Sequence, residues 1–171
     1  GAPRCDVISL RPDGEHERTD RELFDLIARS LDFSRLTNGA FDITYASVGY
    51  LYDYRQHFHP DEKALAAALL TVDYRQLRLD PATRTVAFGR PGMRIDLGGI
   101  AKGYAVDRGI QILKDRGFTR AMVNAGGDTR VSGDRFGKPW VVGIRHPDRK
   151  DEVSLRIPLV DAAFSTSGDY E

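Results

Sequence analysis

The segment Asp96–Gly103, with the sequence DLGGIAKG, contains residue types that suit a phosphate-binding loop. Glycines let the backbone approach an anion closely, and a following helix adds unpaired N–H groups and the positive end of its dipole. Lys102 falls in the first turn of the expected helix, where a cation is unfavourable unless an anion lies nearby. Asp96 can accept hydrogen bonds from a nucleobase or flavin amide, or help to hold a divalent cation. Both roles suit a nucleotide site.

A structural interpretation of the same residues is also open. Gly98 and Gly99 can make a tight strand-to-helix turn that Asp96 caps, which leaves Lys102 in solvent. The spacing matches neither the Walker phosphate loop nor the Rossmann dinucleotide fingerprint. The residue types by themselves therefore leave a phosphate cradle and a plain turn as alternatives. The same choice applies to Gly126-Gly127-Asp128, which predicts either a second turn near the nucleotide or an ordinary hairpin.

Two other polar groups lack the setting of a metal or catalytic site. His57 and His59 occur in a polar loop with Asp53 and Asp61 close in sequence, and such histidines are expected at the surface, so no metal is assigned to them. The serines and aspartate of 165–169 have no histidine near them in sequence, which disfavours a serine hydrolase.

Composition excludes several classes of protein. The chain has 171 residues, 41% of them hydrophobic, which is enough for a real core. The 25 Lys and Arg balance the 25 Asp and Glu, so no net positive charge favours nucleic acid. Cys5 is the only cysteine, which excludes an internal disulfide and a thiolate zinc site. No apolar run is long enough to span a membrane, and any leader or anchor would belong to a longer precursor.

The first hundred residues predict two helices and a hairpin. Leu23, Ile27 and Leu31 recur at helical spacing after the N-cap Asp20, so an amphipathic helix is expected to about residue 32. The aromatic segment 40–59 favours neither helix nor strand. Asp61 is expected to cap a helix that runs through Leu70. Residues 76–88 alternate apolar and polar side chains around Asp80-Pro81, and this pattern predicts a hairpin.

After the glycine segment, apolar spacing predicts a helix over 100–116, with Gly117 as its left-handed C-terminal cap. Short apolar runs beyond it, cut by Gly, Asp and Pro, predict strands in AMVNAG, DTRVSG, WVVGI, VSLRIPL and AAFSTSG. The expected fold class is α+β, with mixed or antiparallel β-sheets and flanking helices.

Four blocks in order resemble the FAD:protein FMN transferase family, also called ApbE-like. They are GAFDIT at 39–44, IDLGGIAKGYAVDRG at 95–109, MVNAGGDTRVSG at 122–133 followed by KPWVVGI, and STSGDYE at 165–171. The resemblance implies a T-fold-type architecture, binding of FAD, a requirement for Mg²⁺, and transfer of FMN to a Thr or Ser hydroxyl of an acceptor protein with release of AMP. Related members instead hydrolyse FAD, so a Mg²⁺-dependent FAD pyrophosphatase is the alternative.

The resemblance also implies roles for individual residues. FAD contacts are carried over to Ala40, Phe41, Asp42, Asp96 and Lys102. Gly99 takes the position of a metal ligand, which acts there through its backbone carbonyl. Ser167 and Glu171 fall in a block that approaches the FAD in some relatives. The resemblance identifies no general base, so the catalytic residue is left unassigned.

The resemblance further implies that residues 1–171 are the central portion of a single larger flavin transferase domain. In the family a His-x-x-Asp-Pro-x-Thr-Gly segment follows, and a later acidic, threonine-bearing segment completes the metal site; neither is found in this sequence. We therefore expect the 171-residue piece alone to be inactive, as a non-catalytic flavin-binding fragment. The family's usual compartment implies a periplasmic or inner-membrane-anchored protein, with a cytoplasmic location as the alternative, and no nucleic-acid partner is expected.

Overall fold

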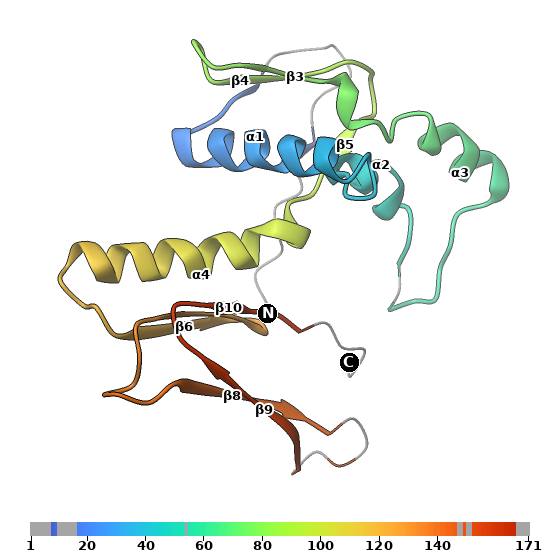
Figure 1. The fold of residues 1–171 in the computed structure, drawn as a ribbon. Coiled ribbons are helices and arrows are strands. Elements are labelled where there is room, and N and C mark those ends of the chain that lie inside the picture. Colours follow the sequence, from blue (N-terminus) through green and yellow to red (C-terminus); the bar gives the residue numbers. More distant parts are fainter. Residues whose placement is uncertain (1–7, 10–16, 54, 147–148, 150–151, 167–171) are drawn as a thin grey trace. The chain divides into compact units, whose positions relative to one another are not determined.

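The computed structural model describes residues 8–9, 17–53, 55–146, 149 and 152–166 (Figure 1). The chain forms two compact units, residues 1–100 and 101–171. Helices combine with small sheets in which every described strand pair is antiparallel. The predicted α+β class is therefore confirmed.

Helix α1 (Arg21–Leu36) organises the first unit. The Asp20 carboxylate caps it by accepting a hydrogen bond from the Leu23 N–H, as predicted. The helix continues four residues beyond the expected end at residue 32, because Ser34 and its neighbours still face the core. It ends where Asn38 and Gly39 take left-handed conformations and donate to the Arg35 and Ser34 carbonyls, a Schellman cap with asparagine in the usual glycine position.

The hairpin β3 (Leu77–Asp80) and β4 (Thr85–Phe88) packs against α1, and β2 (Glu17–Arg18) pairs with β4 (Figure 1). Leu79 lies opposite Val86 across the hairpin, in agreement with the sequence prediction. A second small sheet joins β1 (Ile8–Ser9) to β5 (Arg94–Ile95). The buried core of this unit is formed by Phe24, Ile27, Leu31, Ile43, Tyr74, Leu77, Val86, Met93 and Ile95.

The aromatic segment 40–59, whose sequence favoured neither helix nor strand, is helical over residues 43–49. It forms a 3₁₀ turn η1 (Ile43–Tyr45) and the short helix α2 (Ala46–Gly49), because Ile43 and Ala46 are buried anchors. Helix α3 (Glu62–Leu69) follows, with Asp61 as the predicted N-cap, and the turn η2 (Tyr74–Gln76) leads into β3.

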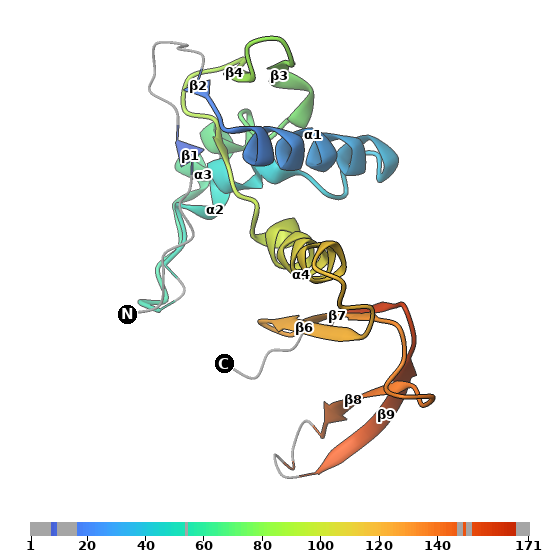
Figure 2. The same ribbon diagram turned by 90° about the vertical axis from the view of Figure 1, so that its left-hand side faces the viewer.

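In the second unit, helix α4 (Gly98–Asp115) lies along the sheet of β6 (Ala121–Ala125), β7 (Asp128–Ser132) and β10 (Ala163–Phe164), as Figures 1 and 2 show. A Cβ on Gly109 would lie 3.1 Å from Val123, so helix and strand are in close contact there. Gly117 is left-handed and caps α4 as predicted. The hairpin β8 (Trp140–Arg145) and β9 (Val153–Leu159) completes the unit.

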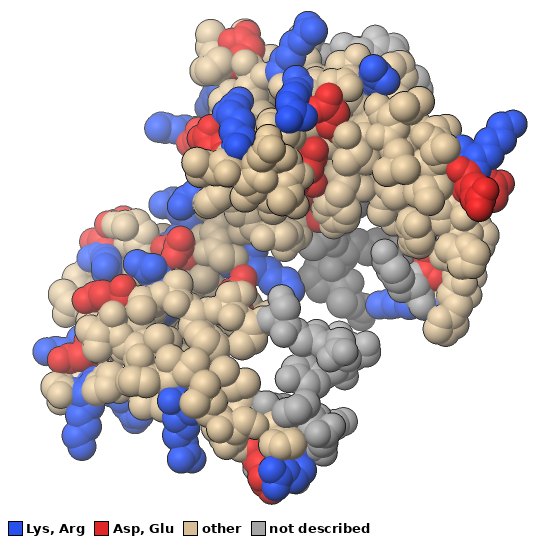
Figure 3. Space-filling view, turned by 45° about the vertical axis from the view of Figure 1, so that its right-hand side comes forward, with Lys and Arg blue, Asp and Glu red and all other residues tan. Residues whose placement is uncertain are grey.

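Charged side chains of both signs are interspersed on the face shown in Figure 3. This distribution agrees with a formal net charge of zero and does not provide a broad basic surface on that face. Among the described helices, none is both long enough and apolar enough to cross a membrane.

Candidate functional site

A pocket in the first unit brings together residues from two distant parts of the sequence. Its volume is about 410 Å³. The lining residues are Gly39, Ala40, Phe41, Asp42, Ile43, Tyr45, Val72, Asp96 and Gly99. Of the residues predicted to contact FAD or metal, six lie in the described part of the chain, and all of these except Lys102 line the pocket.

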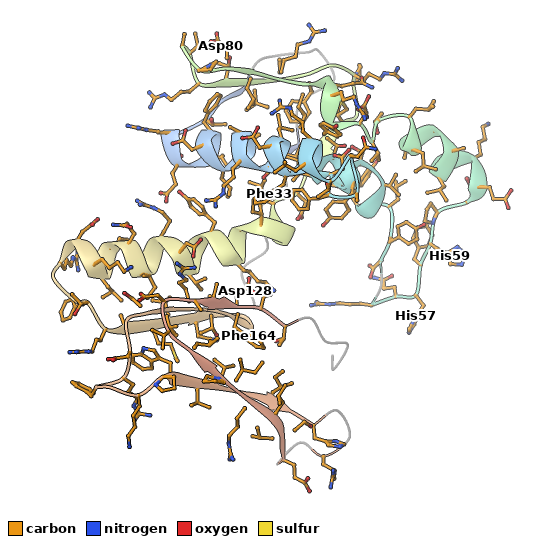
Figure 4. All side chains as sticks on the ribbon, viewed as in Figure 1. Phe33, His57, His59, Asp80, Asp128 and Phe164 are labelled. Carbon is orange, nitrogen blue, oxygen red and sulfur yellow. The ribbon has the colours of Figure 1, made fainter. Side chains whose placement is uncertain are left out.

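One wall of the pocket is the loop that follows α1. The Thr37 hydroxyl donates to the Phe33 carbonyl and accepts a hydrogen bond from the Phe41 N–H at 3.0 Å. Phe41 then places its ring edge-on to Phe33, with 6.3 Å between the ring centres (Phe33 is labelled in Figure 4). The helix end and this aromatic pair together fix the direction of the loop.

Asp42 holds the loop in its conformation with both carboxylate oxygens. Oδ1 accepts from the Thr44 N–H at 2.8 Å and from the Thr44 hydroxyl at 2.6 Å. Oδ2 accepts from the N–H of Tyr74 at 3.0 Å, which ties the loop to η2. The side chain of Asp42 therefore has a structural role beside any contact that it makes with a ligand.

Asp96 connects the loop to the start of α4. Its N–H donates to the Ile43 carbonyl at 2.9 Å, and its Oδ1 accepts from the Gly98 N–H at 2.6 Å. This second bond satisfies one of the unpaired N–H groups at the helix start, so Asp96 caps the helix. A Cβ on Gly98 would lie 2.8 Å from that oxygen, which explains why glycine follows Asp96-Leu97.

The glycine segment is not the loop that its sequence suggested. Gly98 and Gly99 are already the first two residues of α4, and neither is left-handed. The helix therefore begins two residues before the expected start at residue 100, because the Asp96 carboxylate provides the cap there. Gly99 brings the helix backbone close to Phe41, since a Cβ at this position would lie 3.3 Å from the Phe41 ring.

Lys102 lies in the second turn of α4, not in the first turn as predicted. Its side chain is exposed and runs past Gly126 in the second unit, where a Cβ would lie 3.4 to 3.6 Å from its last three atoms. Gly126 and Gly127 form the two-residue turn of the β6–β7 hairpin, both with positive φ. Asp128 follows the turn, and its Oδ1 accepts from the Ser165 hydroxyl (Asp128 is labelled in Figure 4).

The described residues contribute little to a metal site. No group of three or more His, Cys, Asp or Glu among them could hold a metal ion. His57 and His59 are exposed on the loop before α3 and point away from the fold, as expected for surface residues (Figure 4). Gly99, the predicted metal ligand, is in the first turn of α4, and its role as a ligand through the backbone carbonyl stays a prediction.

Some pocket residues were not found by sequence reasoning. Tyr45 and Val72 line the pocket, but neither belongs to a recognisable ligand-binding pattern. Tyr45 follows the resembling block at 39–44 directly, whereas Val72 has no local signal because it reaches the pocket only through packing. Ser167 and Glu171 lie outside the described residues, so their predicted approach to FAD stays a prediction.

Comparison with known proteins gives one consistent result. A model of the ApbE family matches residues 6–171. The FAD:protein FMN transferase of Treponema pallidum (strain Nichols) is 32% identical over 169 residues, which cover 89% of this chain and 47% of that protein. The ApbE protein of Thermotoga maritima has a crystal structure with a TM-score of 0.80 at 38% identity, covering 94% of this chain and 53% of that chain.

The flavin transferase ApbE from Vibrio cholerae also has a TM-score of 0.80, at 28% identity. It is covered to the same extent, with 94% of this chain matching 53% of that chain. The present chain thus spans about half the length of the curated relatives it matches.

Proposed function

This chain belongs to the ApbE family, and we propose that the protein containing it transfers FMN from FAD to a Thr or Ser hydroxyl of an acceptor protein, releasing AMP. The observation that carries the proposal is the pocket itself. Residues 40–42 and the pair Asp96 and Gly99, which come from two blocks that resemble the family's FAD-contacting segments, line one cavity. Residues 1–171 would then be part of a larger transferase domain.

In the proposed reaction the acceptor oxygen attacks the phosphorus on the FMN side of the pyrophosphate. The bond from that phosphorus to the bridging oxygen breaks, AMP leaves with the electron pair, and the hydroxyl proton is released. Charge builds up on the phosphate oxygens during such a transfer, so catalysis depends on positioning and on nearby positive charge.

The residues of this chain are suited to binding and positioning. Phe41, Tyr45 and Val72 offer apolar surface to a flat ring system, and aromatic rings stack well on such surfaces. Lys102 supplies a cation one turn further along α4 from Gly98 and Gly99. It forms no hydrogen bond or ion pair with another residue in the described part of the chain, so its ammonium group is available to a phosphate.

Mg²⁺ belongs to the proposal on the resemblance alone. When bound, it would neutralise charge on the pyrophosphate and leaving group. The Gly99 carbonyl is the ligand that this chain would contribute, and the other ligands would come from outside the described residues. The location implied by the family, periplasmic or anchored at the inner membrane, is proposed on the same ground.

The test uses the full-length protein with FAD, Mg²⁺ and a flavin-accepting domain. Covalent flavin fluorescence that remains on the acceptor after denaturation, with one AMP formed for each labelled acceptor, is the expected result. Accumulation of AMP and free FMN with an unlabelled acceptor would assign a pyrophosphatase instead. No label and no AMP at any Mg²⁺ concentration would contradict both activities.

A further inference from the structure

The turn Arg135–Lys138, between β7 and β8, exposes an aromatic side chain in a conformation that does not suit it. Phe136 is 85% exposed, the highest value among the large apolar side chains that the structure describes. Its φ is +55°, and Gly137 follows with φ +84°. Bulky residues avoid positive φ, and turns of this shape strongly prefer Asn-Gly, Asp-Gly or Gly-Gly. Within the described residues, neither burial nor backbone preference explains a phenylalanine here.

The turn is held firmly despite this mismatch. The Arg135 N–H donates to the Lys138 carbonyl at 2.6 Å, and the Lys138 N–H donates back to the Arg135 carbonyl at 3.3 Å. Arg120 donates from Nε to the Asp134 carboxylate at 3.0 Å and places its guanidinium 5.5 Å from the centre of the Phe136 ring. The ring is therefore presented by a supported turn, which lowers the entropy lost when it is captured.

Three cationic side chains lie near this ring. Arg120, Arg135 and Lys138 lie on or beside the turn, and Asp134 is already bonded to Arg120. Arg135 and Lys138 pair with no carboxylate in the described part of the chain. Next to the ring lies a groove of about 630 Å³ lined by Arg135, Phe136, Lys138, Pro139 and Val141. An aromatic anchor with a cationic rim fits a protein surface that has an apolar recess bordered by carboxylates.

We propose that the Arg135–Lys138 turn is a docking element for the flavin-acceptor protein, with Phe136 as the anchor and the neighbouring cations matching an acidic surface. This inference rests on the proposed transferase function and names the surface that recognises its protein substrate. A membrane surface is the rival occupant. The cations at the turn match a protein surface that carries carboxylates, whereas a single aromatic ring offers little apolar area for insertion into lipid.

The experiment measures FMN transfer by the full-length protein as the acceptor concentration is varied. Phe136→Asn is the informative variant, since asparagine suits the left-handed position and should keep or raise the unfolding temperature. We expect KM for the acceptor to rise about tenfold, as for loss of an interface anchor. The KM for FAD and kcat at saturating acceptor should stay unchanged. Phe58→Ala, which truncates another exposed phenylalanine, is the matched control and should leave all three constants unchanged.

A separate variant tests how much the cations contribute to binding of the acceptor. Reversal of Arg135 and Lys138 to Glu should raise KM for the acceptor and weaken its dependence on salt. The control replaces the exposed Lys63 and Arg78 by Glu, which changes the net charge by the same amount elsewhere on the surface.

An unchanged KM in the Phe136→Asn protein, with normal labelling by the wild type, would overturn this inference and leave the transferase intact. Phe136-dependent binding to phosphatidylserine vesicles with an unchanged acceptor KM would assign the turn to a membrane instead. Absence of transfer by the wild-type protein would remove both the function and this inference.

Discussion

At the scale of single residues, the carboxylates that line the pocket and the proposed phosphate contact Lys102 differ in their hydrogen bonding within the described residues. Asp42 and Asp96 have oxygens engaged in hydrogen bonds that hold the loop and start α4. Lys102 has no such role within the described residues, and its side chain is exposed. The two kinds of residue should respond differently to substitution, which allows structural and binding roles to be separated.

Substitution of Asp42 tests the structural role. In Asp42→Asn the amide group would direct an N–H donor toward either the Tyr74 N–H or the Thr44 N–H, so one hydrogen bond must be lost. We expect a loss of about 1–3 kcal/mol in the free energy of unfolding, measured by urea denaturation. Asp61→Asn is the control, because asparagine is an equally good N-cap for α3. Equal effects of the two substitutions would contradict this assignment.

Substitution of Lys102 tests the binding role. Lys102→Ala should leave the unfolding temperature unchanged, since the side chain is exposed. It should weaken FAD binding about tenfold if a charge-assisted contact to phosphate is lost, as measured by quenching of flavin fluorescence in the full-length protein. Lys114→Ala, near the other end of α4, is the control for the charge change. Unchanged FAD affinity would remove Lys102 from the site.

At the scale of elements, α4 links the parts of the sequence that resemble the family. Gly99 in its first turn lines the pocket, and Gly109 further along contacts Val123 of β6. Gly109 permits that packing, because a Cβ there would meet both methyl groups of Val123 at 3.1 and 3.3 Å. The placement of the helix on the sheet thus depends on a glycine that no cap or turn requires.

Gly109→Leu should separate α4 from β6 and lower the free energy of unfolding by about 1–3 kcal/mol through overpacking. Gly103→Ala is the comparison in the same helix. A Cβ on residue 103 would lie 3.8 Å from its nearest neighbour, Asp128 Oδ2, which is an ordinary contact distance. This substitution should be neutral or stabilising by up to about 1 kcal/mol, because alanine has the higher helix propensity. Thermal unfolding distinguishes the two, and a stabilised Gly109→Leu protein would refute the close contact.

At the scale of the whole molecule, the pKa is lowered for two carboxylates among the described residues, Asp73 in the first unit and Asp134 in the second. Burial alone would raise the pKa of Asp73, but hydrogen bonds from the Arg75 N–H, the Gln76 amide and the Arg75 guanidinium together lower it. Hydrogen bonds from the Gly137 N–H and then the Arg120 side chain lower the pKa of Asp134. Both groups bind protons more readily in the unfolded chain, so their contribution to stability depends on pH.

Because both pKa values are lowered, the free energy of unfolding should fall as the pH is lowered. A lowered folded-state pKa contributes stability that is complete above the unfolded value of about 3.9 and is lost as pH falls through the folded value. Asp73→Asn should therefore be less stable than the wild type at pH ~7, with the difference shrinking below pH ~4. Urea unfolding across this range provides the measurement. A difference that stays constant with pH would show that the Asp73 charge is not responsible.

Local signals in the sequence determined much of this protein. The N-caps Asp20 and Asp61, the β3–β4 hairpin and the Gly117 cap follow from interactions within a few residues, and the ordered blocks identified the family.

Only the tertiary structure decided how these parts form a site. It placed Ala40–Asp42 beside Asp96 and Gly99, recruited Val72, and gave Asp42 a partner 32 residues away in Tyr74. It also showed that in the segment Asp96–Gly103 the residues Gly98 and Gly99 begin helix α4 instead of forming a loop. Such contacts depend on packing around a shared core, and the free energy of that packing is not encoded in any short stretch of sequence.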